Sequence, residues 1–296
     1  MYNVQMLAQA YEACEALARS HYENFPVASV LLPRPMRPHI AAVYAFARTA
    51  DDIADEGDAP GADRRVELDA WQRRLHAAVE SASWQPSGTR DDLILAAVAA
   101  SVRALNLPLS LFDDLISAFG QDTMTNRYGS WADVFDYCRR SANPIGRLVL
   151  RIAGYHDDAL DRSSDALCTA LQLTNFWQDF GRDWRAGRLY VPRDVQRATG
   201  ADESQLGGGT LSTPWARALE QCITVTRERF AEGRVVCDGV RGRLRAELRL
   251  TWLGGSRILD RVEHGRFLLV GRRPTLRLAD VPLLTWRALA WRPAGT

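Results

Sequence analysis

Apolar residues recur every three or four positions along almost the whole chain, which is the spacing of one helical face. From Val4 to Ala18 this spacing predicts a first helix over residues 4–20. Similar segments, bounded by Pro, Gly, Ser or Asp, predict further helices over 36–56, 62–82, 89–105, 108–120, 144–154, 158–184, 214–232 and 238–263. We find no useful run of alternating polarity and no fixed-period repeat. The pattern predicts an all-α fold.

Breaks in the pattern mark the connections. Ser130 is a candidate N-cap for a helix that opens near Trp131, and Pro144 should interrupt that helix because proline lacks a backbone donor. Residues 198–213, rich in Gly, Ser and Thr, are expected to form a loop. An arginine-rich segment that ends in 281–291 follows the last predicted long helix. Because no long linker divides the chain, we predict a single domain over residues 1–296.

A polar stripe crosses the helix predicted at 36–56. Tyr44, Arg48, Asp51 and Asp55 are spaced four, three and four residues apart and share a face, with Asp52 on its flank. The surrounding residues are apolar or small: Ile40, Val43, Ala47, Ala50, Ile53 and Ala54. Carboxylates one turn apart repel each other unless a positive charge lies between them. This stripe indicates either a divalent-cation site or a helix that ends in acids by chance.

A second stripe lies in the helix predicted at 158–184. Gln172, Asn175, Asp179 and Asp183 are spaced three, four and four residues apart, again on one face. Large apolar residues flank them: Leu171, Leu173, Phe176, Trp177, Phe180 and Trp184. Two such stripes in one all-α chain favour two aspartate-bearing helices that face each other across a central cavity.

Oxygen ligands favour a hard cation, Mg²⁺ or Mn²⁺ in its place, over zinc or copper. A di-iron bundle would need Glu-x-x-His pairs, and the sequence has none. Because Mg²⁺ is typically shared between one or two carboxylates and the phosphates of a substrate, we expect a diphosphate ligand. Aromatic residues beside the stripes would exclude water and tolerate a carbocation, which indicates an isoprenyl diphosphate.

Composition excludes several other classes of protein. The formal net charge of +1 gives no reason to propose nucleic acid as a partner. The five cysteines are scattered and never form C-x-x-C, so a disulfide framework or zinc site is not expected. There is no signal-peptide pattern and no apolar run approaching the ~18 residues needed to span a bilayer. We expect a cytoplasmic protein.

Peripheral contact at the inner face of the membrane is compatible with the C-terminal segment. A membrane-surface patch there would consist of Arg266, Arg272, Arg273, Arg277, Trp286, Arg287, Trp291 and Arg292. The alternative is a last helix packed on the bundle with solvated arginines.

The motifs resemble those of the squalene/phytoene synthase family over nearly the whole chain. The matching pieces are His21-x-x-x-Phe25, Leu31-Leu-Pro33, Tyr44-x-x-x-Arg48-x-x-Asp51-Asp52-x-x-Asp55, Tyr137-Cys138, Gln172-Leu-x-Asn175-x-x-x-Asp179-x-x-x-Asp183 and Gly187-Arg188-x-Tyr190-x-Pro192. The resemblance implies an all-α isoprenoid-synthase bundle, two aspartate-rich Mg²⁺ motifs and head-to-head joining of prenyl diphosphates.

The resemblance also implies roles for residues. Asp51, Asp52 and Asp55 match the first metal motif; Asn175, Asp179 and Asp183 match the second. Positions that contact diphosphate or line the site are Tyr44, Arg48, Gln172, Arg188 and Tyr190. Tyr137 matches a tyrosine implicated in ionisation, while His21 and Phe25 match a segment over the diphosphate. We expect Arg48 and Arg188 to stabilise the diphosphate, and Tyr137 and Tyr190 to position it or donate hydrogen bonds.

Two departures from the family pattern point to one branch. Gln178 stands where the family commonly has arginine, and 141–146 reads Ser-Ala-Asn-Pro-Ile-Gly where it commonly reads A-G-x-V-G. Loss of a fixed positive charge should weaken the hold on one of two diphosphates, which suits a substrate with only one. The chain is most similar to the branch that makes hydroxysqualene in bacterial hopanoid and squalene biosynthesis.

That branch implies a carbon–oxygen lyase that converts presqualene diphosphate with water to hydroxysqualene and diphosphate, without NADPH. We also expect functional coupling to other enzymes of the squalene pathway. The alternatives are a head-to-head prenyltransferase that makes presqualene diphosphate, squalene or phytoene, and a non-catalytic assembly factor. An assembly factor would be expected to lose acidic ligands, and here all are present.

Overall fold

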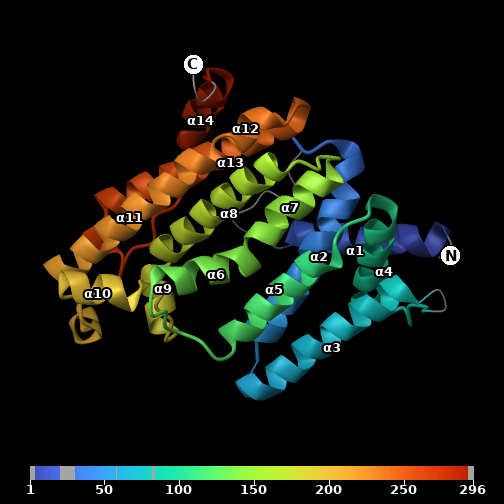
Figure 1. The fold of residues 1–296 in the computed structure, drawn as a ribbon, viewed down its shortest axis with the longest axis horizontal. Coiled ribbons are helices and arrows are strands. Elements are labelled where there is room, and N and C mark those ends of the chain that lie inside the picture. Colours follow the sequence, from blue (N-terminus) through green and yellow to red (C-terminus); the bar gives the residue numbers. More distant parts are fainter. Residues whose placement is uncertain (1–3, 21–30, 58, 82–83, 293–296) are drawn as a thin grey trace. The chain divides into compact units, whose positions relative to one another are not determined.

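The computed structural model describes residues 4–20, 31–57, 59–81 and 84–292. These residues form helices joined by turns, and their paired extended chain is limited to an isolated bridge between Arg127 and Leu189 (Figure 1). The all-α prediction is confirmed.

The chain forms two compact units. One consists of Met1–Met124 and Pro144–Asp157, and the other of Thr125–Asn143 and Asp158–Thr296. Each unit has its own set of packed helices. The single domain over 1–296 and the central cavity stay predictions.

The helices of the first unit pack around α2 (Arg37–Asp55), which follows the short 3-10 helix η1 (Arg34–Met36). Helix α2 contacts the other four long helices of this unit, which are α1 (Val4–Ser20), α3 (Gly61–Glu80), α4 (Arg90–Leu105) and α5 (Leu109–Asp122). Phe46 of α2 is fully buried; its ring centroid lies 5.5 Å from that of Trp71 and 5.3 Å from that of Phe112. This core fixes the apolar side of α2 against α3 and α5, so its polar stripe lies on the remaining side.

Hydrogen bonds join α2 to its neighbours at the other end. The Ser101 hydroxyl donates to the carbonyl of Ala97 at 2.8 Å and lies 2.8 Å from His39 Nδ1 and 3.0 Å from the Tyr11 hydroxyl. Burial lowers the pKa of His39, which favours a neutral imidazole in this contact. The cluster links α1, α2 and α4 without a fixed charge.

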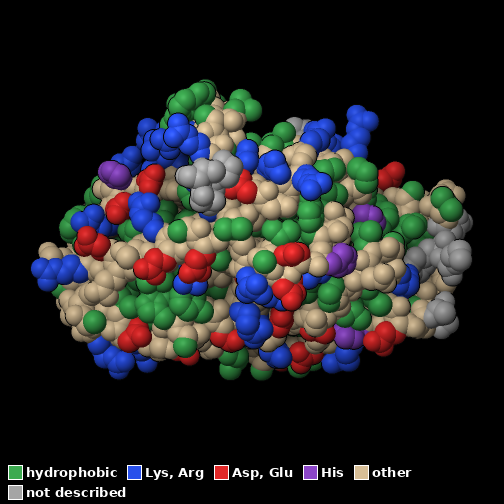
Figure 2. Space-filling view, turned by 45° about the horizontal axis from the view of Figure 1, so that its top comes forward, with side chains coloured by type: hydrophobic (Ala, Val, Ile, Leu, Met, Phe, Trp, Pro, Cys, Tyr) green, Lys and Arg blue, Asp and Glu red, His purple; other side chains and the backbone are tan. Residues whose placement is uncertain are grey.

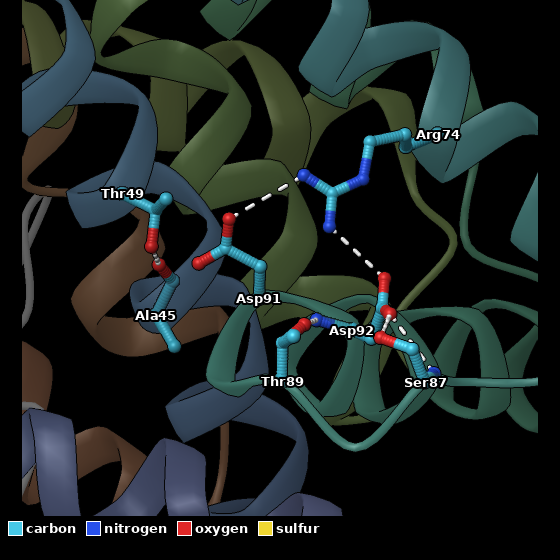
Figure 3. Close-up of polar contacts among 7 residues, drawn as sticks. All are labelled: Ala45, Thr49, Arg74, Ser87, Thr89, Asp91 and Asp92. Carbon is cyan, nitrogen blue, oxygen red and sulfur yellow. Dashed lines mark hydrogen bonds and ion pairs between the residues drawn. The ribbon is translucent and has the colours of Figure 1, made fainter.

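The α3–α4 connection is fixed by ion pairs and a helix cap (Figure 3). Arg74 of α3 lies 2.9 Å from Asp92 and 3.4 Å from Asp91, both in the first turn of α4. The Thr89 hydroxyl accepts the Asp92 backbone N–H at 3.2 Å, which satisfies one of the first donors of α4. Figure 3 also shows Thr49 of α2 donating to the carbonyl one turn earlier. These aspartates have structural partners and are not part of the predicted metal motifs.

The second unit is organised around α8 (Asp158–Gln178), which contacts α6 (Trp131–Ser141), α9 (Phe180–Arg185), α11 (Thr213–Gly233), α12 (Val236–Gly239) and α13 (Gly242–His264). The indole N–H of Trp177 donates to the Thr226 hydroxyl at 2.9 Å and joins α8 to α11. The unit also contains α10 (Arg193–Thr199), η2 (Glu203–Gly207), η3 (Arg266–Leu268) and α14 (Asp280–Leu289). Helix α7 (Asn143–Ile152) belongs to the first unit from Pro144 on.

Several sequence predictions can be checked directly. Ser130 is the N-cap of α6, and the chain is interrupted before Pro144, as predicted. The predicted loop at 198–213 is wrong in part, because α10 extends into it and η2 lies within it. Short helical turns of five to seven residues give too little periodicity to be recognised.

Two predicted absences concern the described residues. No helix there has a stretch long and apolar enough to cross a membrane. None of the five cysteines forms a disulfide, and burial raises the pKa of the Cys14 thiol to about 12. Four of them, Cys14, Cys138, Cys222 and Cys237, are buried and act as small core residues.

Candidate functional site

The first acidic cluster lies at the C-terminal end of α2, in the first unit. Arg48 reaches three carboxylates: Asp52 at 2.6 Å, Asp51 at 3.3 Å and Glu56 at 3.3 Å. The arginine side chain is 16% exposed, whereas that of Asp51 is 40% exposed. The Arg48 guanidinium is therefore largely covered, while the carboxylates that it contacts remain accessible to a ligand.

The position of these aspartates is electrostatically unfavourable for a helix. The last turn of α2 contains no basic residue, and the exposed carbonyls at a helix C-terminus already carry partial negative charge. Arg48 from one turn earlier compensates for part of this, and Arg64 donates to the carbonyls of Ala54, at 2.5 Å, and of Gly57. Such a local conflict is common where residues serve function rather than stability.

The second acidic motif lies where one predicted helix becomes two. The predicted helix over 158–184 is wrong in this respect, since α8 ends at Gln178 and α9 begins at Phe180. Asp179 leaves the helical conformation, with φ of −94° and ψ of 9°, and caps α9. A Cβ on Gly181 would lie 2.2 Å from the carbonyl oxygen of Val270. The backbone of α9 can approach the segment after α13 only because residue 181 has no side chain.

Asp179 is bound by two side chains in this unit. The Asn175 amide donates to Asp179 Oδ2 at 3.1 Å. Arg273 grips both carboxylate oxygens, with Nη2 at 3.1 Å from Oδ2 and Nε bonded to Oδ1. The Asp179 side chain is 12% exposed, so this is a charge-assisted bidentate pair in a partly desolvated place. Arg273 is also one of the residues of the hypothetical membrane-surface patch, but the contact that the structure shows for its guanidinium is the one with Asp179.

Gln178 helps to place Arg273. The Gln178 amide donates to the carbonyl of Pro274 at 2.6 Å, and Arg185 donates to that of Val270 at 2.8 Å. Together they tie the segment 269–274 to the junction between α8 and α9. The position where the family commonly has arginine thus carries an amide that docks the segment bearing Arg273.

Asp183 and Arg188 form a further polar pair in this unit. Arg188 Nη2 lies 3.7 Å from Asp183 Oδ1, and the Arg188 backbone N–H donates to the Asp183 carbonyl at 2.7 Å. Arg127 supports the turn between them by donating to the Gly187 carbonyl at 2.6 Å, and it holds the pKa of Glu203 below its usual range through a hydrogen bond at 2.8 Å.

An aromatic cluster lies beside the second motif. Phe176 and Tyr190 stack with ring centroids 3.7 Å apart, and Tyr137 lies 6.0 Å from Phe176 and 6.2 Å from Tyr190. Tyr128 also stacks on Tyr190, with ring centroids 5.5 Å apart. Backbone bonds from Leu189 to the Asn126 carbonyl and from Arg193 to the Tyr128 carbonyl hold the two chain segments together. Electron-rich ring faces of this kind can stabilise a cation.

Sequence reasoning missed Tyr128 as a member of the cluster. Its place depends on pairing with a segment about 60 residues later, a separation for which local periodicity gives no signal.

Tyr44 and Gln172 are half-buried. Tyr44 lies one turn before Arg48, and Gln172 lies one turn before Asn175. His21 and Phe25 lie outside the described residues. The roles of all predicted site residues stay predictions.

Comparison with known proteins decides the family. Residues 18–280 match squalene/phytoene synthase, which is most of the chain. The chain belongs to the squalene/phytoene synthase family. Its relatives in this family are enzymes that act on prenyl diphosphates.

Hydroxysqualene synthases are among the most similar relatives. The chain is 39% identical to that of Zymomonas mobilis over 210 residues, which cover 69% of this chain and 66% of the relative, just under two thirds of its length. It is 36% identical to that of Rhodopseudomonas palustris over 213 residues, covering 72% and 69%. A phytoene synthase of Mycobacterium tuberculosis is 34% identical over 226 residues, covering 76% and 71%.

Solved structures agree on the fold. The squalene synthase HpnC from Alicyclobacillus acidocaldarius has a TM-score of 0.80 at 38% identity and covers 89% of this chain and 96% of its own. A dehydrosqualene synthase in complex with ligand has a TM-score of 0.84 at 19% identity, covering 97% and 98%, and supports the fold alone. The prediction of an isoprenoid-synthase helical fold is confirmed.

Proposed function

We propose that this chain is a hydroxysqualene synthase, a carbon–oxygen lyase that converts presqualene diphosphate and water to hydroxysqualene and diphosphate. The observation that carries the proposal is its identity of 35–39% to hydroxysqualene synthases from three bacteria. The two acidic motifs and the aromatic cluster support the proposal.

The donor set fits Mg²⁺, with Mn²⁺ as a possible replacement. The residues that would hold it offer oxygen: Asp51, Asp52 and Asp55 on α2, and Asn175, Asp179 and Asp183 on α8 and α9. The described residues contain no cluster of three or more His, Cys, Asp or Glu side chains arranged as a ready metal site. This suits an ion that uses one or two carboxylates and completes its coordination with water and substrate phosphates. When bound, the ion would neutralise charge on the departing diphosphate.

In the ionisation step, the bond between the cyclopropylcarbinyl carbon and the diphosphate oxygen breaks, and its electron pair leaves with the oxygen. We propose that Arg48 and Arg188 stabilise the negative charge that develops there. Their guanidinium groups are 16% and 29% exposed and are preorganised beside aspartates, so little reorganisation is needed as charge develops.

The aromatic cluster would hold the cation until water captures it. The faces of Phe176, Tyr137 and Tyr190 offer negative potential without a nucleophile, while the rearranging cation stays protected from early capture. A water oxygen then bonds to the rearranged carbon and loses a proton. Ser141, one turn after Tyr137 on α6, has a buried hydroxyl with no hydrogen-bond partner among the described residues, and it could hold that water.

Arg273 competes with a metal for Asp179. In an Arg273→Gln variant, Asp179 loses its cation, and we expect the free energy of unfolding to fall by about 1–2 kcal/mol because the carboxylate is largely buried while the arginine is partly exposed. Mg²⁺ should raise the melting temperature of this variant more than that of the unaltered chain, since it need not displace a guanidinium. Thermal unfolding with chelator and with excess Mg²⁺ measures both effects.

Arg272→Gln is the matched control, because Arg272 is the exposed neighbour. Equal Mg²⁺ stabilisation in all three proteins would contradict the assignment of Asp179 as a ligand.

The nearest alternative is a condensing prenyltransferase. The 34% identity to a phytoene synthase supports this alternative. The two functions differ in which prenyl diphosphate the enzyme converts when it is the sole substrate. With presqualene diphosphate alone we expect hydroxysqualene and diphosphate, at a kcat/KM at least about 100-fold above that for farnesyl diphosphate. Product chromatography and diphosphate release measure both reactions, with a chelated sample as control. Efficient condensation of farnesyl or geranylgeranyl diphosphate would overturn the proposal.

The reaction has a defined place in a sequence. A condensing enzyme must supply presqualene diphosphate, and an enzyme that removes a hydroxyl must act if squalene is the end product. We propose that this chain works in the cytoplasm, functionally coupled to those enzymes.

A further inference from the structure

Helix α14 and the turn that leads into it, residues 278–289, present an unusually apolar surface. Leu278 is 91% exposed, Leu289 81%, Trp286 64% and Val281 54%. Among the described residues, eight of the twelve large hydrophobic side chains with high exposure lie between 267 and 289: Phe267, Leu268, Leu276, Leu278, Val281, Leu283, Trp286 and Leu289. Apolar patches of this kind mark interaction sites, whereas single exposed residues do not.

The opposite side of α14 is firmly held, so the exposure is not the result of a loose end. Leu284 is 8% exposed, and Asp280 is 5% exposed. The Arg277 backbone N–H donates to Asp280 at 2.6 Å, and Arg257 and Arg261 lie 3.3 and 2.8 Å away; these bonds hold the pKa of Asp280 below its usual range. The buried anchor fixes which face of α14 points outward.

The chain after α14 is anchored as well. The Trp291 indole N–H donates to Asp238 at 3.0 Å, and the guanidinium of Arg234 lies 4.1 Å from the Trp291 ring. For Trp291, these contacts favour the alternative in which the end of the chain packs on the bundle.

Within residues 265–292, the exposed charged side chains are all arginines. Arg272, Arg277, Arg287 and Arg292 are exposed, and residues 265–292 contain one acid, the buried and paired Asp280. In the space-filling view, green hydrophobic side chains project at the upper edge, where α14 lies in Figure 1, with blue arginine side chains beside them (Figure 2). An apolar ridge with Trp and Leu, flanked by arginine without exposed carboxylates, has the composition of a helix that lies in a bilayer interface.

We propose that the outward face of α14 docks on an anionic lipid bilayer, with Leu278, Trp286 and Leu289 entering the interface and the arginines contacting lipid phosphates. A second copy of this chain is a poorer occupant, since a two-fold contact would bring arginines against arginines. A ten-residue helix is also only ~15 Å long and offers less than the ~800 Å² per partner of a stable interface. The inference goes beyond the proposed reaction and does not depend on it.

Vesicle sedimentation tests the proposal with the full chain. We expect binding to phosphatidylcholine vesicles that contain phosphatidylglycerol to be at least about tenfold tighter than to phosphatidylcholine alone, and to weaken at high salt. The variant Leu278→Ser/Trp286→Ser/Leu289→Ser should bind at least about tenfold less. The variant Arg277→Gln/Arg287→Gln should bind the anionic vesicles about 30-fold more weakly.

The matched control is Val66→Ser/Met124→Ser, which removes exposed apolar side chains of the first unit and should bind like the unaltered chain. The proposal would be overturned if the α14 variants bound vesicles as tightly as the unaltered chain, or if the chain showed no preference for anionic vesicles. A dimer in solution that the α14 triple variant dissociates would favour a second copy instead.

Turnover of presqualene diphosphate in detergent separates this inference from the proposed function. A chain that binds vesicles through α14 but does not act on presqualene diphosphate would contradict only the proposed function.

Discussion

Replacing Asp179 with asparagine is expected to lower diphosphate release from presqualene diphosphate by about 1000-fold at saturating Mg²⁺. The substitution keeps the shape and one hydrogen-bond acceptor, so the Asn175 contact can persist. It removes the negative charge that Arg273 now pairs with and that a metal would need. Steady-state release of diphosphate measures the effect, and circular dichroism checks that the variant is folded.

Asp158→Asn is the control for this prediction, because Asp158 is an exposed aspartate in the first turn of the same helix α8. It should retain nearly full activity. If Asp179→Asn released diphosphate at the rate of the control, the metal-site proposal would be wrong.

The partner experiment uses the first motif. Asp51→Asn should also lower the rate by about 1000-fold, and the double variant with Asp179→Asn should fall much less than the product of the two single effects. Groups that act as a unit in one step show this non-additivity, whereas independent sites give multiplicative losses. Multiplicative losses would indicate that the two motifs serve separate steps.

Gly181→Ala is expected to lower the free energy of unfolding by about 2–3 kcal/mol and to reduce activity at least about tenfold. A Cβ there would meet the backbone carbonyl oxygens of Val270 and Leu269 at 2.2 and 2.6 Å. Backbone cannot rotate away as a side chain can, so the segment that carries Arg273 must move from Asp179. Thermal unfolding and presqualene diphosphate turnover measure the two effects.

Gly207→Ala is the matched control, since nothing lies within 4 Å of a Cβ at that position. It should be close to neutral in both assays. A Gly181→Ala variant that behaved like Gly207→Ala would show that close docking of 269–274 on α9 is not needed for stability or catalysis.

The all-α fold could be predicted because long amphipathic helices repeat the same spacing many times. Each of α1 to α5 was predicted to within about four residues at either end. The short α10 and η2 were missed, because a few residues do not establish a period. The end of α8 at Gln178 was missed because Asp179 and its neighbours continue the helical spacing, whereas the contact of Gln178 with Pro274 at the break is a tertiary one.

Residue spacing along the chain was enough to predict the two polar stripes, since side chains three and four residues apart share a helical face wherever the helix packs. The arginine that pairs with Asp179 could not be predicted in this way, because Arg273 is 94 residues away and its arginine-rich segment also suggested a membrane patch. The stacking of Tyr128 on Tyr190 and the exposure of the apolar side chains of α14 likewise depend on tertiary packing. Local spacing fixes a face, but which face is covered depends on packing between distant segments.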